Sequence, residues 1–225
     1  MNVRAVWVAA IVGAVAPAAG ATPAPNQVNT FQAGNVAAWT NGDRITDPAI
    51  VAAGGPAGAS DAFLRVTANG GGGPGSKLIT FNQSAAWSGN FTTAGVNAIS
   101  MDLKNFNTFP LSMRIGLEET GGTWYVLNPA FTLPADNAWH TATFNLAAAN
   151  FSTVTGGTPL ATGLTRVREF RILHNPSVDY RGAAVSASFG VDNIRAVPEP
   201  AATLLLAPLV PMLSRRRRSH SPAGD

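Results

Sequence analysis

Alternation of apolar and polar residues is the feature of this chain that most restricts its fold. In the segment 111–118, aliphatic residues occupy the four odd positions, and polar residues or glycine occupy the even ones. Because successive side chains of a β-strand point to opposite faces of a sheet, this period of two predicts a strand with one face on a core and the other in water. Comparable runs predict further strands at 63–67, 77–82, 98–104, 139–146, 167–173 and 185–191.

Turn-forming clusters separate these runs. Examples are Gly54-Gly55-Pro56, Gly121-Gly122 and Gly156-Gly157. The segment 22–196 contains no helical periodicity over a dozen residues, although 146–151 is long enough for one short helical turn. Many short antiparallel strands in a region of this size predict an all-β fold, most simply a single jelly-roll β-sandwich over residues 22–196.

The N-terminal end differs in composition from this region. Arg4 precedes an apolar run at 5–16, and small residues follow Pro17 as far as Ala21. A charged start, a short apolar run and a small-residue cleavage site are typical of a secretory signal peptide, so we expect residues 1–21 to be removed. The alternative is a buried N-terminal helix, which Pro17 would end abruptly.

The charge and cysteine content exclude several functions. The whole chain has 15 Lys and Arg against 12 Asp and Glu, but residues 22–196 contain ten of each. A neutral domain lacks the electrostatic attraction on which nucleic-acid binding depends, so no nucleic-acid partner is expected. The chain has no cysteine, which excludes a thiol nucleophile and a thiolate metal site. The absence of disulfides in an exported domain favours a bacterial origin. Such a domain must be stabilised by its hydrophobic core.

The last 29 residues combine three features in a fixed order. An apolar segment at 201–214 is shorter than the roughly 20 residues of a full membrane crossing, but it is suited to a C-terminal hydrophobic anchor or sorting helix. Basic clusters stay on the cytoplasmic side of a membrane, so the arginines that follow would leave the domain outside. A disordered basic tail is the alternative. The motif before the apolar segment is Val197, Pro198, Glu199 and Pro200, and the basic cluster after it is Arg215, Arg216, Arg217 and Arg218.

This tail resembles the PEP-CTERM sorting signal of Gram-negative bacteria, which has the same three parts in the same order. The resemblance implies recognition by an exosortase-type membrane protease during a transient stay in the inner membrane. It also implies cleavage near the Pro-Glu-Pro and delivery to the cell surface or the extracellular matrix. Proteins with such signals accompany exopolysaccharide production.

The domain itself carries a second resemblance. Four short motifs, NTFQAGNVAAW, SDAFLRV, AWSGNFT and FGVDNI, are similar to those of carbohydrate-binding, galactose-binding-like jelly rolls of bacterial surface proteins. That family implies binding of an extracellular polysaccharide. It also implies a structural calcium ion where the terminal strands meet, at positions that match Gln32 and Asp192, although the family usually places an acidic residue at the position of Gln32. The alternative is that Asp192 and Asn193 are simply hydrogen-bonding residues at a strand end.

Groups suited to catalysis are few between residues 22 and 196. Neither His140 nor His174 belongs to a recognisable triad. Glu118 and Glu119 are adjacent, so on a strand they point to opposite faces and cannot act as a glycosidase pair. The glycine run that begins at Gly70 leads into a predicted strand and not a helix, so it fails the dinucleotide-binding pattern. We therefore predict no catalytic residues and no enzymatic activity.

A sugar-binding face can be predicted from strand parity. Arg114 and Glu118 share the polar face of the segment 111–118, and Arg171 has the polar parity of its own strand. Trp124 follows a glycine turn, where an indole can lie flat at a surface. Sugar recognition needs an aromatic platform with a few charged or amide groups beside it, and these four residues provide both. The alternative is that Trp124 belongs to the core and Tyr125, of opposite parity, is exposed.

These observations predict an exported, non-catalytic surface or matrix protein whose jelly roll binds polysaccharide. A purely structural matrix or adhesion component without a glycan site is the first alternative. A polysaccharide-active enzyme is the second.

Overall fold

The computed structural model describes residues 23–42, 47–73 and 75–199. The predicted signal peptide, the apolar tail segment and the arginine cluster lie outside these residues. Within the described ranges the chain forms twelve strands, one 3-10 turn and one four-residue helix. These are β1 (Val28–Asn29), β2 (Ala49–Val51), β3 (Phe63–Asn69), β4 (Ile79–Asn82), β5 (Val96–Asn105), β6 (Leu111–Glu119), β7 (Trp124–Leu127), β8 (Phe131–Leu133), β9 (Trp139–Asn145), η1 (Ala148–Asn150), β10 (Phe151–Thr155), α1 (Leu160–Gly163), β11 (Val167–His174) and β12 (Ser186–Pro198).

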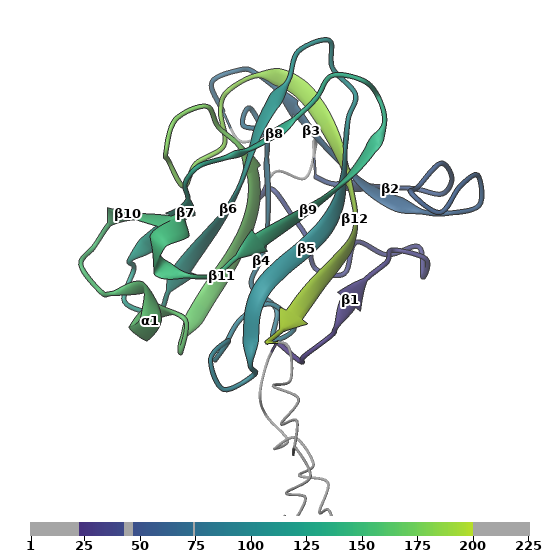
Figure 1. Ribbon diagram of the computed structural model, residues 1–225. Coiled ribbons are helices and arrows are strands. Elements are labelled where there is room, and N and C mark those ends of the chain that lie inside the picture. The colour runs from purple at the N-terminus through teal and green to yellow at the C-terminus, as the bar shows by residue number, and fades with distance from the viewer. Residues whose placement is uncertain (1–22, 43–46, 74, 200–225) are drawn as a thin grey trace, which may run out of the picture.

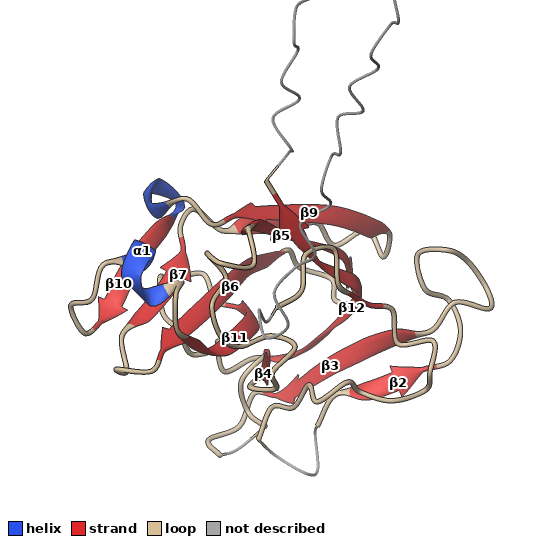
Figure 2. Ribbon diagram, turned by 90° about the horizontal axis from the view of Figure 1, so that it is seen from below, coloured by secondary structure: helices blue, strands red, loops and turns tan. Residues whose placement is uncertain are grey.

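The strands form two antiparallel sheets that pack face to face (Figures 1 and 2). The first sheet has the order β2-β3-β12-β5-β9, with β1 paired to β12. The second sheet has the order β10-β7-β6-β11-β4, with β8 paired to β6. The predicted all-β, two-sheet sandwich is therefore confirmed.

The core lies between the sheets, where the alternation of the sequence predicts it. The odd-numbered aliphatic residues of β6 are at most 1% exposed, and they pack in one cluster with inward side chains of β5, β11 and β12. Truncating one such side chain to alanine costs about 2–5 kcal/mol. The central members of the cluster are Leu111, Met113, Ile115, Leu117, Ile99, Met101, Leu103, Phe170, Ile172, Phe189 and Val191.

All seven predicted strands are present, and the predicted turn at 146–151 contains η1. The largest difference from the predicted strands is at β12, which continues beyond the predicted end at Val191 as far as Pro198. A bulge between Asp192 and Arg195 shifts the register, with Asn193 in the left-handed region at φ 50°. The extra residue breaks the period of two, so the alternation that predicts the strand ends at the bulge. Strands β1, β2, β7, β8 and β10 have five residues or fewer, too few for a clear pattern.

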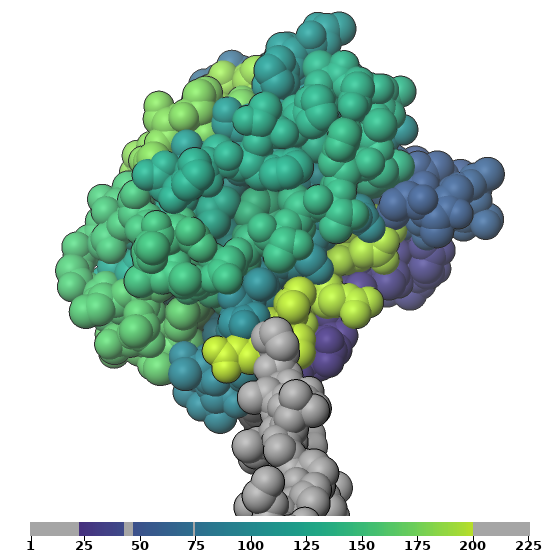
Figure 3. Space-filling view, in the orientation of Figure 1, coloured from purple at the N-terminus to yellow at the C-terminus, as the bar shows by residue number. Residues whose placement is uncertain are grey.

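The two ends of the described domain lie side by side. The backbone N–H of Asn26 donates to the carbonyl of Ala196 at 2.9 Å, and β12 continues through the first two residues of the Val-Pro-Glu-Pro motif. The N–H of Glu199 donates to the carbonyl of Gly95 at 3.0 Å. Figure 3 shows the end of β12 at the surface beside the N-terminal segment. No helix in the described ranges is long and apolar enough to span a membrane.

Candidate functional site

The outer face of the second sheet carries all four residues predicted to bind a glycan. Glu118 on β6 is the cross-strand partner of Trp124 on β7, and such partners share a face of the sheet. Tyr125 has the opposite parity and lies in the core, where its hydroxyl donates to the carbonyl of Thr158 at 2.7 Å. Trp124 therefore lies on the outer face, as its predicted role requires, and not in the core between the sheets.

The ring of Trp124 is covered. It is only 6% exposed, because Tyr180, from the loop between β11 and β12, stacks on it with 4.6 Å between ring centroids and 17° between planes. The guanidinium carbon of Arg171 lies 3.9 Å from the centroid of Trp124, and Arg171 Nη1 donates to the carbonyl of Tyr180 at 2.9 Å. Cation–π contact and ring stacking therefore hold these three side chains as one rigid unit.

Arg114 fastens the same loop to the sheet. Its Nε donates to the carbonyl of Asn175 at 3.0 Å, its Nη2 to that of Pro176 at 3.3 Å and its Nη1 to that of Leu127 at 2.5 Å. The residue is 4% exposed, and burial lowers the pKa of its guanidinium. With its donors engaged by carbonyls, Arg114 positions the loop that bears Tyr180 and has no free face for a ligand.

Two buried carboxylates face each other on this surface. Glu118 and Glu169 are cross-strand partners on β6 and β11, a pairing that strand parity alone does not predict. Glu118 is paired with Arg168, and Glu169 with Arg171. Each carboxylate is hydrogen-bonded to an arginine, so this pair does not resemble the free acid and base of a glycosidase.

The exposed part of the surface surrounds Arg171. Tyr180 and Phe81 are half-buried, and the guanidinium carbon of Arg171 lies 5.5 and 5.6 Å from their ring centroids. Gln83, an exposed residue next to β4, donates to Glu169 at 2.5 Å. Neither Tyr180 nor Phe81 is predicted from the sequence. Ile79 and Phe81 alternate with the polar residues Thr80 and Asn82, a pattern that favours an inward Phe81, whereas the structure buries Thr80 and Asn82 instead. Tyr180 is an isolated aromatic residue in a polar loop.

The two histidines in the described ranges lie on different sheets, His140 on β9 and His174 on β11. His140 contacts the exposed carboxylate of Asp136 through Nε2 at 2.9 Å. His174 is 6% exposed, and its Nδ1 accepts a hydrogen bond from the backbone N–H of Ser112 at 2.8 Å. Burial lowers the pKa of His174. Glu119, which follows Glu118 in the sequence, is paired with Arg166. Neither histidine forms part of a nucleophile–base arrangement in the described contacts.

Gln32 and Asp192, the predicted calcium ligands, occupy an oxygen-rich region at the first sheet. Asp192 on β12 is 0% exposed, and neither of its carboxylate oxygens has a hydrogen-bond partner. Burial raises the pKa of Asp192 to about 7; the backbone N–H of Asn193 lowers it in part, and the neighbouring charges of Asp61 and Asp102 add to the rise. Gln32 Nε2 contacts Asp61 Oδ1. A buried, unpartnered carboxylate beside other oxygen atoms has the donor chemistry that calcium requires.

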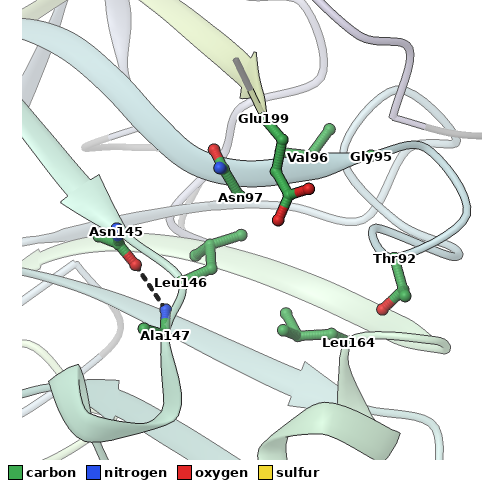
Figure 4. A pocket seen from close by; sticks show the side chains of 9 residues that line it. All are labelled: Thr92, Gly95, Val96, Asn97, Asn145, Leu146, Ala147, Leu164 and Glu199. Atoms are coloured by element: carbon green, nitrogen blue, oxygen red, sulfur yellow. Dashed lines mark hydrogen bonds between the residues drawn. The ribbon is translucent and has the colours of Figure 1, made fainter. Parts of the chain in front are cut away.

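A pocket lies next to the C-terminal end of β12, and the side chain of Glu199 points into it (Figure 4). Asn97 from β5 and Asn145 from β9 form part of its wall, and Leu146 and Leu164 add apolar surface. The third residue of the Val-Pro-Glu-Pro motif is therefore in contact with the folded domain.

No family model and no curated protein sequence matches this chain. Among solved structures, an exo-β-agarase is similar with 12% identity over 78% of this chain and 26% of that chain, at a TM-score of 0.55. The module of "Solution structure, dynamics and binding studies of CtCBM11" is similar with 17% identity over 80% of this chain and 99% of the module, at a TM-score of 0.51. The family 11 carbohydrate-binding module of a cellulosomal cellulase of Clostridium thermocellum has 15% identity over 78% of this chain and 95% of the module, at a TM-score of 0.45.

The domain has the fold of carbohydrate-binding modules. The predicted jelly-roll resemblance is thereby confirmed at the level of the fold. The chain spans about a quarter of the agarase and almost the whole of CtCBM11. At these identities the similarity shows a shared fold alone and does not identify a ligand.

Proposed function

We propose that this protein is a non-catalytic, polysaccharide-binding module that acts outside the cell. The observation that carries the proposal is the stacked pair of Trp124 and Tyr180 with the guanidinium of Arg171 against it. Trp124 supports Tyr180 from below, and Tyr180 is the member of the pair that is open to solvent.

The chemistry of this surface suits a sugar chain. The apolar face of a pyranose ring packs on an aromatic ring, and its hydroxyl groups need hydrogen-bonding partners at the edge of that contact. Tyr180 and Phe81 supply rings close to Arg171. The exposed charged and amide groups nearby are Arg168 and Gln83, which can exchange hydrogen bonds with hydroxyls. Because Glu118 and Glu169 already hold these two side chains, the site needs little ordering when a ligand arrives.

Affinity electrophoresis tests this function. The purified protein is run through gels containing agarose, mixed-linkage β-glucan or xylan, and we expect at least one of them to retard it. Tyr180→Ala should weaken that retention by about tenfold or more, which corresponds to about 1.4 kcal/mol. Phe109→Ala is the matched control, since Phe109 is an aromatic residue with 38% exposure in the loop between β5 and β6. Equal retention of both variants would place the binding elsewhere.

A structural role in a matrix is the second candidate, and one observation favours it. The loop that bears Tyr180 covers part of the outer face, and Trp124 and Arg114 are almost fully buried under it. On this alternative the aromatic stack only fastens the loop. The protein would then migrate unchanged through every polysaccharide gel, and Tyr180→Ala would lower thermal stability without any effect on migration.

The proposed delivery to the cell surface rests on the two ends of the chain. Residues 1–21 would direct export, and an exosortase-type protease in the inner membrane would cleave near the Pro-Glu-Pro. Mass spectrometry of the surface fraction should find a chain without residues 1–21 and without Arg215–Arg218. Glu199→Ala should leave uncleaved protein in the inner membrane. Recovery of the intact arginine cluster from the surface fraction would overturn this part of the proposal.

A further inference from the structure

Two cations flank one glycine on the outer face of the first sheet. Gly190 in β12 is the cross-strand partner of Arg65 in β3 on one side and of Lys104 in β5 on the other. Such partners share a face of the sheet, and with a strand spacing of about 4.8 Å the two side chains begin roughly 10 Å apart. Arg65 is exposed and Lys104 is half-buried. Because glycine has no side chain, residues of other strands fill the space between the two cations.

Aromatic rings occupy that space. A Cβ at Gly190 would collide with the rings of Trp139 and Phe63. Phe63 packs edge-on against Trp139 and stacks on Phe106, with centroid distances of 5.2 and 6.0 Å. Trp139 and Phe106 are half-buried, whereas Phe63 is only 4% exposed. The sheet therefore presents two aromatic rings to solvent at the level of the two cations.

The cations lie against these rings. The guanidinium carbon of Arg65 is 4.9 Å from the centroid of Phe106. Nζ of Lys104 is 5.5 Å from the same centroid and 6.0 Å from that of Trp139. Arg65 Nη2 also donates to Ser188 Oγ at 3.2 Å. Contacts with ring faces and a hydroxyl orient the two cations without neutralising their charge.

The rings are fixed to the sheet by neighbouring polar groups. Asn107 Nδ2 donates to the carbonyl of Ser188 at 2.8 Å, and Asn107 Oδ1 accepts from the N–H of Ser188 at 3.0 Å. These two bonds hold the backbone next to Phe106 against β12. Trp139 Nε1 donates to the carbonyl of Gly54 at 3.0 Å, in the loop between β2 and β3. The aromatic surface is thus ordered before any ligand arrives, which lowers the entropic cost of binding.

Neither Arg65 nor Lys104 belongs to an ion pair in the described ranges. The second sheet differs in this respect, because Arg166, Arg168 and Arg171 are each paired with a glutamate there. The arginine charges of the second sheet are therefore largely compensated within the protein, whereas the two cations of the first sheet remain available to an external anion.

The outward carboxylates of the first sheet do not compensate the two cations. Asp102 is two positions before Lys104 on β5, and it accepts hydrogen bonds from Thr141 Oγ1 at 2.5 Å and from Asn193 Nδ2 at 2.8 Å. Asp192, the cross-strand partner of Asp102, is 0% exposed. Asp102 is thus held by its own neighbours and Asp192 is closed to solvent, while the cations reach the surface beside the rings.

We propose that the surface formed by Arg65, Lys104, Phe106 and Trp139 binds an acidic polysaccharide. The rings offer a platform for the apolar face of a sugar, and the cations bind an anionic group that the sugar carries. Hydrogen bonds from a guanidinium or ammonium group to a carboxylate or sulfate are about twice as strong as neutral ones. The anionic group is the carboxylate of a uronic acid or a sulfate ester. This surface and the face around Tyr180 lie on different sheets, so each can be tested without the other.

Calorimetric titration with paired polymers tests the need for a charged sugar. The arginines at 215–218 are replaced by Gln in every protein compared, so that the tail cannot bind anions. The pairs are dextran sulfate with dextran, and polygalacturonate with its methyl ester. We expect the charged member of at least one pair to bind more tightly than its neutral partner. Binding should be lost at about 1 M NaCl, where the Debye length is about 3 Å. The pair that responds identifies a sulfate ester or a uronate as the ligand group.

Substitutions test whether this surface is the site. Lys104→Gln and Arg65→Gln should each weaken binding of the charged polymer by about tenfold, whereas Lys104→Arg keeps the charge and should retain it. Lys77→Gln is the matched control, because Lys77 is also half-buried and outside the ion pairs of the described ranges. It should bind like the parent protein.

Three results would overturn the proposal. The first is equal binding of the charged and the neutral polymer in both pairs. The second is a pair of Gln variants that bind like Lys77→Gln and only melt at a lower temperature, which would show that the cations merely stabilise the rings. The third is loss of the charged polymer in Tyr180→Ala but not in Lys104→Gln, which would assign the anion to the second sheet.

Discussion

Trp39 and Trp87 share a single hydrogen-bond acceptor. Their indole N–H groups donate to the same atom, Oδ1 of Asn29, at 3.0 and 2.6 Å, and both rings are at most 1% exposed. The rings also pack on each other and on Phe170, with centroid distances of 5.3–6.0 Å. A two-residue strand near the N-terminus thus satisfies the polar atoms of the largest side chains in the core.

Asn29→Ala should be one of the most destabilising single changes to a partly exposed residue. It leaves two buried indole donors without a partner, and each such donor costs about 1–3 kcal/mol. Urea denaturation should therefore show a loss of about 2–6 kcal/mol. Asn35→Ala is the control, because the side chain of Asn35 is exposed and accepts only from the N–H of Ala37 in a turn. A loss below about 1 kcal/mol for Asn29→Ala would mean that water replaces the shared acceptor.

Gly190→Ala should destabilise the first sheet. Alanine usually stabilises a strand relative to glycine by roughly 0.5–1 kcal/mol. At Gly190, however, a Cβ would lie 2.9 Å from Trp139 Cη2 and 3.2 Å from two ring carbons of Phe63. Overpacking of this kind costs about 1–3 kcal/mol. Denaturant unfolding should show the loss for Gly190→Ala and none for Gly72→Ala, where a Cβ would meet nothing within 4 Å. A stabilised Gly190→Ala would contradict the packing described here.

Arg114→Lys should loosen the loop between β11 and β12. Lysine carries its donors on one nitrogen and cannot reach carbonyls on both β7 and the loop, as the arginine fork does. The exposed Arg181 in this loop offers a trypsin site. We expect cleavage after Arg181 to be several-fold faster in Arg114→Lys than in the parent protein. Arg65→Lys, on the other sheet, should leave the rate unchanged. Equal rates in all three proteins would show that Arg114 does not hold the loop.

Acid should destabilise the protein partly through His174. Burial lowers the pKa of His174 below its usual 6.5, so the unfolded chain takes up a proton at a higher pH than the folded one. The contribution of His174 to stability is therefore complete above pH of about 6.5 and is lost as the pH falls toward the folded-state pKa. His174→Asn does not titrate and retains an acceptor for the N–H of Ser112. Its stability, from urea melts at stepped pH, should fall less steeply below about pH 6.5. Parallel curves would refute the assignment.

The sequence predicts those parts of the molecule that depend on local alternation. Segment 111–118 is a strand, and its parity places Arg114 and Glu118 on the face that Trp124 and Arg171 share. Such parity can be read from a few neighbouring residues, because side chains on one face of a strand recur every second position.

Contacts made by loops could not be predicted in the same way. Tyr180 covers Trp124 because the loop after β11 folds back over the second sheet, and Asp61 lies near Asp192 because another loop folds over the first. Both placements depend on tertiary contacts such as those of Arg114 and Trp139. No local sequence pattern indicates these tertiary contacts. The same holds for the end of β12, where a bulge at Asn193 interrupts the alternation although the strand continues.

Strand β12 also determines how the domain would bear a load. It lies between β3 and β5 in the middle of its sheet, and the chain leaves it at Pro198 toward the tail. Hydrogen bonds of antiparallel strands run perpendicular to the strand axis. A pull on the tail along β12 would therefore strain the bonds to both neighbours together, in shear, and would not open them one after another. A module held at a surface by this end would resist the drag of flowing liquid with a whole ladder of bonds at once.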